Sequence, residues 1–211
     1  MNDGAQGVDE AVWRWLERSR EVGFLGPGPV DAHVEHALGF AEVVGAPPTS
    51  VVDLGSGGGV PGLVLASVWP DTRVVLLDSM ERRTAFLSEA VQGLGWHGRV
   101  EVVRTRAEVA GRDKSFRGWH DAVVSRSFGA PSVTAECAAP LLRVGGRLVV
   151  SEPPEETGER WPSDGLATLG LALQERRTAT NRAGYAVLVQ EAPCSVKFPR
   201  REGVPTKRPL W

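Results

Sequence analysis

A glycine-rich loop at residues 53–62 is the feature of the sequence that predicts chemistry most clearly. It reads Asp-Leu-Gly-Ser-Gly-Gly-Gly-Val-Pro-Gly and follows the apolar run 51–54. Glycines without side chains allow the backbone to approach a ligand closely. We expect this loop to surround a bound cofactor through Asp53, Gly55, Ser56, Gly57, Gly59 and Val60.

An acidic residue stands about 20 residues beyond the loop, the distance at which dinucleotide sites place a ribose-binding acid. This residue, Asp78, ends a second apolar run and is followed by Ser79. We expect both to contact a nucleoside-bearing ligand. The competing interpretation is an ordinary glycine turn with a helix-capping aspartate, which four glycines within residues 55–59 disfavour.

Two kinds of nucleoside cofactor fit these residues. The spacing Gly57-x-Gly59-x-x-Gly62 also satisfies the dinucleotide fingerprint. Asp53 argues against NAD, because a carboxylate beside the loop repels a pyrophosphate and attracts the cationic amino-acid end of S-adenosylmethionine. The only tyrosine, Tyr185, also lacks the lysine four residues later that a short-chain dehydrogenase needs. S-adenosylmethionine is the expected cofactor, and a dehydrogenase is the weaker alternative.

Short β-rich runs alternate with amphipathic segments from residue 49 onward. This alternation predicts an α/β fold: a Rossmann-like, mostly parallel sheet with helices on both faces. We expect residues 49–211 to form this domain and 1–48 to form an N-terminal helical cap, together one structural unit. A helix is expected around 165–171 and a mobile acidic loop at 152–164. The expected strands are 51–54, 74–77, 100–103, 122–125 and 148–151, with 173–180 and 185–190 as closing antiparallel strands.

Parallel sheets bind ligands at the carboxyl ends of their strands, which brings two further segments to the same edge. Ala107 and Glu108 follow the third expected strand, and Arg126 follows the fourth. We expect Arg126 to face the ligand, with a surface ion pair as the alternative.

The charge of the chain does not indicate a uniformly basic nucleic-acid-binding protein. With 24 basic and 26 acidic residues, an anionic partner has to meet a local patch. The proline- and arginine-rich tail supplies one, and a solvated terminus that folds back on the sheet is the competing interpretation. The candidate phosphate contacts are Lys197, Arg200, Arg201, Lys207 and Arg208, and the cations between Arg99 and Arg117 are candidates to extend them.

Other residue types predict neither a metal site nor a membrane segment. Cys137 and Cys194 lack the spacing of a zinc site or a disulfide framework. No apolar run approaches the roughly 20 residues that span a bilayer. We expect a cytoplasmic monomer without a metal.

These motifs together resemble the RsmG (GidB) family of 16S ribosomal RNA guanine-N7 methyltransferases. The resemblance extends from about Ala32 onward and implies a class I S-adenosylmethionine-dependent methyltransferase whose partner is 16S rRNA or the small-subunit particle. It implies cofactor contacts by Gly55, Val60, Ala107, Glu108 and Arg126, and an RNA-site role for His36. It rests on the loop 53–62, the segments 77–79, 106–108 and 125–126, and the tail motif Phe198-Pro199-Arg200-Arg201 with Gly203, Pro205 and Lys207.

Two positions depart from the family pattern where RNA would be handled. Glu35 precedes His36 where members usually have arginine, and Glu152 lies where a lysine-glycine pair is common. An acid beside a phosphate repels it. Two alternatives therefore stay open: a divergent methyltransferase for a small molecule or another RNA, and a non-catalytic RNA-binding paralogue. Because guanine N7 carries a free lone pair, no residue is assigned to acid–base catalysis, and Arg126 is the candidate for positioning the substrate.

Overall fold

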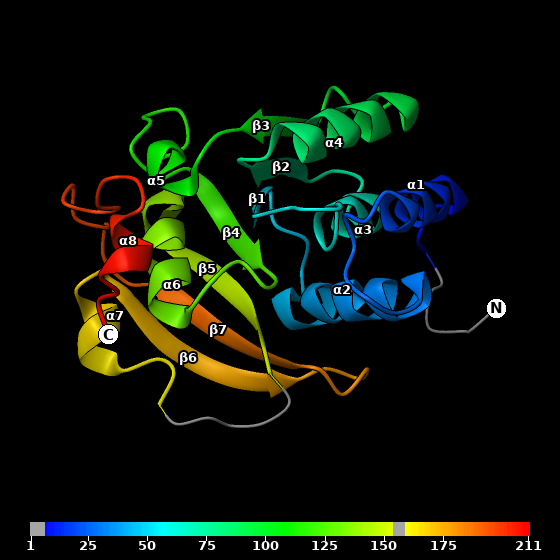
Figure 1. The fold of residues 1–211 in the computed structure, drawn as a ribbon. Coiled ribbons are helices and arrows are strands. Elements are labelled where there is room, and N and C mark those ends of the chain that lie inside the picture. Colours follow the sequence, from blue (N-terminus) through cyan, green and yellow to red (C-terminus); the bar gives the residue numbers. More distant parts are fainter. Residues whose placement is uncertain (1–6, 154–158) are drawn as a thin grey trace.

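Seven strands form one sheet in the order β3-β2-β1-β4-β5-β7-β6 (Figure 1). The computed structural model describes residues 7–153 and 159–211. Strands β1 to β5 pair in parallel, and β7 lies antiparallel between β5 and β6. The predicted sheet is thereby confirmed. The strands are β1 (Ser50–Leu54), β2 (Arg73–Asp78), β3 (Val100–Arg104), β4 (His120–Ser125), β5 (Leu142–Glu152), β6 (Leu171–Thr178) and β7 (Gly184–Gln190).

Helices cover both faces of the sheet, as the alternating pattern predicted. Strand side chains alternate between two hydrophobic clusters: Val51 and Val124 belong to one, and Val52 and Val123 to the other. The first face carries α1 (Glu10–Glu21), α2 (Val30–Val44), α3 (Gly62–Val68) and α4 (Glu81–Gly93). The second carries α5 (Ala107–Ala110), α6 (Pro131–Ala138), the 3-10 helix Ala139–Leu141, α7 (Ser163–Ala167) and α8 (Val204–Lys207).

Two helices, α1 and α2, lie in the N-terminal region for which the sequence predicts a helical cap. Asp9 caps α1 by accepting a hydrogen bond from the Ala11 amide at 2.7 Å. Helix α2 shares a core with the sheet, since Phe40 is fully buried beside Tyr185, whose hydroxyl donates to the His36 carbonyl at 2.7 Å. This packing holds α2 against the sheet.

Two expected segments differ in detail from the structure. The predicted helix around 165–171 is partly wrong, because α7 ends at Ala167 and β6 begins at Leu171. Gly170, with φ of +75°, supplies the left-handed turn between them. Of the expected acidic loop, Glu152 belongs to β5, and 154–158 lies outside the described residues.

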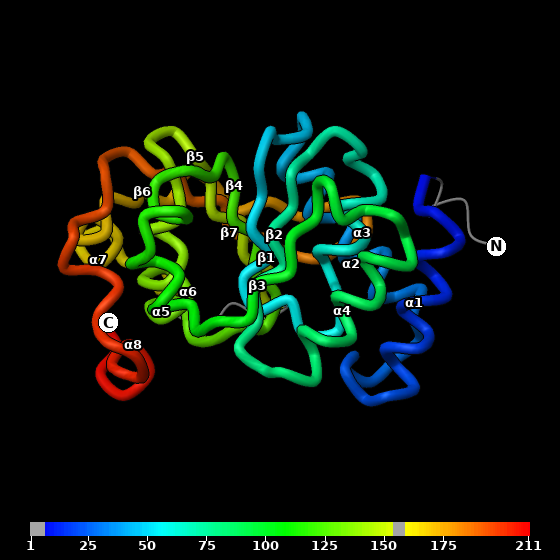
Figure 2. The backbone as a smooth tube through the Cα atoms, turned by 90° about the horizontal axis from the view of Figure 1, so that it is seen from above, coloured from blue at the N-terminus to red at the C-terminus, as the bar shows by residue number. Residues whose placement is uncertain are grey.

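The C-terminal tail folds back over the second face. Viewed from above, the tail with α8 lies at one end of the molecule and α1 at the other (Figure 2). Arg117 fixes the tail by donating hydrogen bonds to the carbonyls of Phe198, Cys194 and Ser195 at 2.7–2.9 Å. Arg117 therefore anchors the tail, although its sequence position suggested a patch cation.

Candidate functional site

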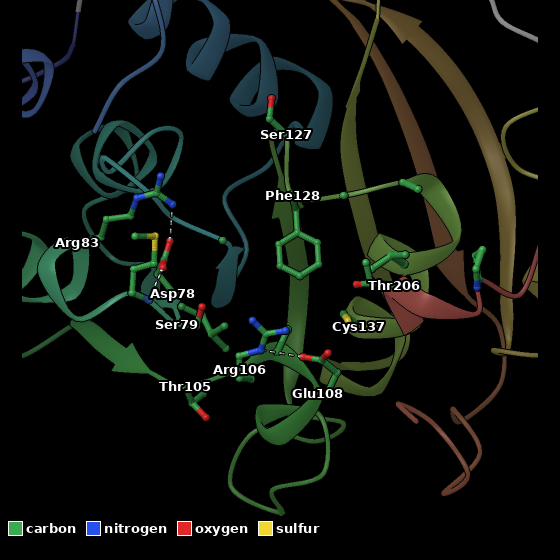
Figure 3. A pocket seen from close by; sticks show the side chains of 18 residues that line it. Asp78, Ser79, Arg83, Thr105, Arg106, Glu108, Ser127, Phe128, Cys137 and Thr206 are labelled. Atoms are coloured by element: carbon green, nitrogen blue, oxygen red, sulfur yellow. Dashed lines mark hydrogen bonds and ion pairs between the residues drawn. The ribbon is translucent and has the colours of Figure 1, made fainter. Parts of the chain in front are cut away.

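A cavity of about 440 Å³ opens at the carboxyl ends of β1 to β4 (Figure 3). Its walls come from the segments that follow these four strands and from the C-terminal tail. Five of the predicted cofactor residues line it: Gly55, Asp78, Ser79, Ala107 and Glu108. Asp53, Ser56, Gly57, Gly59 and Val60 belong to the loop that carries Gly55, and they are absent from the cavity lining.

The backbone orients the Asp78 carboxylate in this cavity. Oδ2 accepts from the Gly57 amide at 2.9 Å, and Oδ1 accepts from the Met80 amide at 2.8 Å. Arg83 Nη1 lies 3.7 Å from Oδ2, as the dashed line in Figure 3 marks. Each carboxylate oxygen can accept a further hydrogen bond. Asp78 can therefore hold the two hydroxyls of a ribose while it also ties the glycine loop to β2.

The glycine loop takes a shape that other residues rarely adopt. Gly55, Gly57 and Gly59 have φ of +79°, +53° and +98°, in the left-handed region. A Cβ on Gly55 would lie 2.7 Å from Cδ2 of Phe128, which leaves no room for a side chain there. Ser56 points away from the cavity, since its hydroxyl donates to the Asp53 carbonyl at 2.9 Å.

Asp53 is a buried acid with unused hydrogen-bonding capacity. Oδ2 accepts from the Gly62 amide at 2.9 Å, whereas Oδ1 has no hydrogen-bond partner among the described residues. Burial raises the pKa of Asp53 to about 7, although the Gly62 amide and the charge of Arg126 act in the opposite direction. Within the described part of the chain, Oδ1 is thus an unused acceptor directly beneath the glycine loop.

Glu108 connects the cavity to the tail. Its Oε1 accepts from the Gly203 amide at 2.9 Å, and Arg106 Nε lies 3.7 Å from Oε2. Thr206 of α8 forms part of the cavity wall. In the view of Figure 3, Phe128 lies between Asp78 and Thr206. Phe128 was not predicted from the sequence, although it lies only two residues after Arg126 at the same edge of the sheet. The place of Thr206 in the cavity wall could not be predicted from the sequence, because it depends on how the tail folds back.

A second cavity, of about 560 Å³, adjoins the first at Ser127, Phe128 and Gly129. The ends of β4 and β5 and the start of α2 contribute to its walls. Arg126 lines this cavity and is absent from the lining of the first. Its position therefore suits the predicted role in positioning a substrate better than the predicted cofactor contact. His33, His36, Glu152 and Arg160 also line it.

Two histidines of α2, His33 and His36, line the second cavity together with Arg126. Nη2 of Arg126 lies 3.2 Å from His33 Nδ1, and His33 Nε2 lies 3.1 Å from the Gly26 carbonyl. Because a carbonyl only accepts, His33 donates from Nε2 and accepts from Arg126 at Nδ1. Burial is the main cause that lowers the pKa of His36 to about 4, and the positive charge of Arg126 is the second. Burial also lowers the pKa of His33. Both rings are uncharged at neutral pH.

The Glu152 carboxylate is paired. Its Oε2 accepts from Arg160 Nε at 2.9 Å, and its Oε1 accepts from Trp161 Nε1 at 3.1 Å. The acid that replaces a base here is thus balanced by a neighbouring cation, which weakens the repulsion expected between Glu152 and a phosphate.

The predicted RNA contacts in the tail separate into two groups. Lys197, Arg201, Lys207 and Arg208 are exposed. Arg200 instead faces inward, where its guanidinium and backbone amide bind the fully buried Glu136 of α6. We therefore correct the expectation for Arg200, which holds the tail in place. Sequence reasoning missed Glu136, since an acid on a largely apolar helix gives no sign of a distant partner.

The described residues contain neither a metal-binding cluster nor a membrane-spanning helix. Within 7–153 and 159–211, no group of three or more His, Cys, Asp and Glu side chains could hold a metal ion. None of the helices described is long and apolar enough to cross a membrane.

Known proteins match this chain in sequence over most of its length. The family model described as "rRNA small subunit methyltransferase G" matches residues 30–157. A protein of Moorella thermoacetica named "Ribosomal RNA small subunit methyltransferase G" is 35% identical over 170 residues, which cover 78% of this chain and 70% of that protein. A protein of the same name from Symbiobacterium thermophilum is 33% identical, covering 95% of this chain and 87% of that protein.

Solved structures share the fold at lower identity. "Cofactor-bound Rv0187 from MTB" is 20% identical with a TM-score of 0.61, covering 88% of this chain and 92% of that one. An O-methyltransferase from Bacillus cereus in complex with SAH is 14% identical with a TM-score of 0.58, covering 86% and 90%. The predicted class I methyltransferase fold is confirmed. The chain belongs to the rRNA small subunit methyltransferase G family, and it is an S-adenosylmethionine-dependent methyltransferase.

Proposed function

We propose that this protein methylates N7 of a guanine in 16S rRNA of the small ribosomal subunit. The observation that carries the proposal is the junction of two cavities at Ser127–Gly129. The first cavity presents Asp78, which would bind a ribose, and the glycine loop at Gly55. The other has a volume within the usual range for ligand sites and carries Arg126. Family membership supports ribosomal RNA as the source of the acceptor base.

Positioning is the main task of the residues in this reaction. The bound cofactor supplies an electrophilic methyl group on a sulfonium. Guanine N7 has a free lone pair, so no side chain has to remove a proton. Holding two reactants in line contributes roughly 7–11 kcal/mol in favourable cases. Asp78 would hold the ribose in the middle of the cofactor, and Asp53 beneath the glycine loop would favour its cationic amino-acid end. Arg126, oriented by His33, would position the base or a neighbouring phosphate.

The exposed cations of the tail fit an RNA partner. Lys197, Arg201, Lys207 and Arg208 would contact phosphates, and α8 brings part of this set close to the cofactor cavity. N7 lies on the Hoogsteen edge, which a protein reaches in loops and unpaired segments rather than within an A-form helix. We therefore propose an accessible loop or an incompletely assembled subunit as the substrate, and a cytoplasmic monomer as the working form.

A methyl-transfer assay tests this proposal. The purified protein is incubated with S-adenosylmethionine carrying a labelled methyl group and with 16S rRNA from cells that lack the protein. The proposal predicts labelled 7-methylguanosine at one position after nuclease digestion. Label in another RNA only would support the divergent enzyme. RNA binding without any label would support the non-catalytic paralogue.

A further inference from the structure

Glu152 lines the second cavity, which shares Ser127, Phe128 and Gly129 with the cofactor cavity. In the parallel register of β4 and β5, Ser125 pairs with Val150. β4 ends at this pair, whereas β5 continues for two more residues to Glu152. Ser127 lies in the bend that follows β4, and both Ser127 and Glu152 line the second cavity. Ser127 lines both cavities, whereas Glu152 lines only the second. A base in the second cavity with N7 toward the shared residues Ser127–Gly129 would face the methyl donor there and could meet Glu152 at another part of the wall.

The Glu152 carboxylate is oriented but not saturated. Arg160 and Trp161 each donate one hydrogen bond, to different oxygens of the carboxylate. Its side chain is only 10% exposed, so these donors hold it in a largely dry environment. An ionised carboxylate has about four acceptor positions, which leaves roughly one on each oxygen for a ligand. The ligand that such a pair recognises best has two adjacent N–H donors.

Guanine presents that pair of donors on the edge opposite N7. N1–H and the 2-amino group lie side by side on its Watson–Crick edge, which enzymes read when a base leaves its stack. Adenine offers a lone pair at N1 instead and would be repelled by the carboxylate. We propose that Glu152 is a specificity-determining residue that accepts hydrogen bonds from N1–H and the 2-amino group of the target guanine. This inference rests on the proposed function.

The same ion pair could instead serve only to fasten the segment 159–161 to β5. In that case, loss of the Glu152 carboxylate would lower stability without changing the preference for one base over another. Stability and base preference are therefore the two quantities that have to be measured separately.

Inosine separates the two roles because it keeps N7, O6 and N1–H and lacks only the 2-amino group. An RNA fragment that contains the modified position is made with guanosine or inosine there, and methylation rates are compared at limiting substrate. We expect the wild-type protein to prefer guanosine by about tenfold or more, as for a hydrogen bond to a charged group. Glu152→Gln should lower the rate on guanosine and bring the two rates close together. The exposed Glu159→Gln serves as the matched control and should keep the wild-type preference.

The outcomes distinguish the two proposals. Equal rates on guanosine and inosine with the wild-type protein would overturn the role of Glu152, and this arm needs no variant to fold. An unchanged preference in Glu152→Gln, whose folding is checked by thermal unfolding, would overturn it as well. Methylation of neither RNA by the wild-type protein would overturn the proposed function, and the role of Glu152 with it.

Discussion

Arg200 and Glu136 form a two-point ion pair, with Arg200 Nε 2.9 Å from Oε1 and Nη2 2.6 Å from Oε2 of Glu136. The Glu136 side chain is fully buried, and the Arg200 amide donates a third hydrogen bond to it at 2.7 Å. This pair joins the C-terminal tail to α6. The basic tail is thus partly a structural element.

Arg200→Ala should therefore destabilise the protein. Removing one partner of a buried pair leaves an uncompensated charge and typically costs about 3–5 kcal/mol. Urea unfolding should show a loss of this size, whereas Arg201→Ala, at an exposed position, should change the unfolding free energy by less than about 0.5 kcal/mol. Similar stabilities for the two variants would contradict the role given to Arg200.

The exposed tail cations should govern the salt dependence of RNA binding. Arg201→Gln and Lys207→Gln each remove one expected phosphate contact. Each should weaken binding and reduce the slope of log K against log salt by about 0.7–0.9. Arg14→Gln on α1, where Arg14 pairs with exposed Glu10, is the matched control and should leave the slope unchanged. A slope unaffected by the tail variants would indicate that RNA binds elsewhere.

The difference between Arg200 and Arg201 shows where sequence reasoning ends. The strands and the glycine loop follow from local patterns, so the sheet and the residues at its carboxyl edge could be predicted. Which neighbouring arginine turns inward depends on Glu136, 64 residues away. The second cavity was equally hidden, because α2 and the ends of β4 and β5 meet only in the folded chain.

Asp53 should make the stability of the unliganded protein depend on pH. Burial raises the pKa of Asp53 in the folded state from 3.8 to about 7. The folded state therefore favours the protonated acid, and this contribution to stability is present below about pH 4 and is lost as the pH rises to and through about 7. Unfolding measured from pH 4 to 8 should show a fall in stability that is absent in Asp53→Asn. Parallel profiles for the two proteins would contradict the assignment.

Asp78→Ala should weaken cofactor binding. It removes the acceptors for the ribose hydroxyls and also the contact that holds the Gly57 amide. We expect the Kd for S-adenosylmethionine, measured by calorimetry, to rise about tenfold or more. Glu89→Ala on the exposed face of α4 is the control and should bind normally. Unchanged affinity in Asp78→Ala would show that the ribose is not placed at the end of β2.

Nucleoside analysis of 16S rRNA from cells without the gene measures whether this protein makes a 7-methylguanosine in that RNA. We expect one 7-methylguanosine to disappear from this RNA, to return with the wild-type gene, and not to return with the Asp78→Ala variant. An unchanged 7-methylguanosine content after loss of the gene would contradict the proposed function.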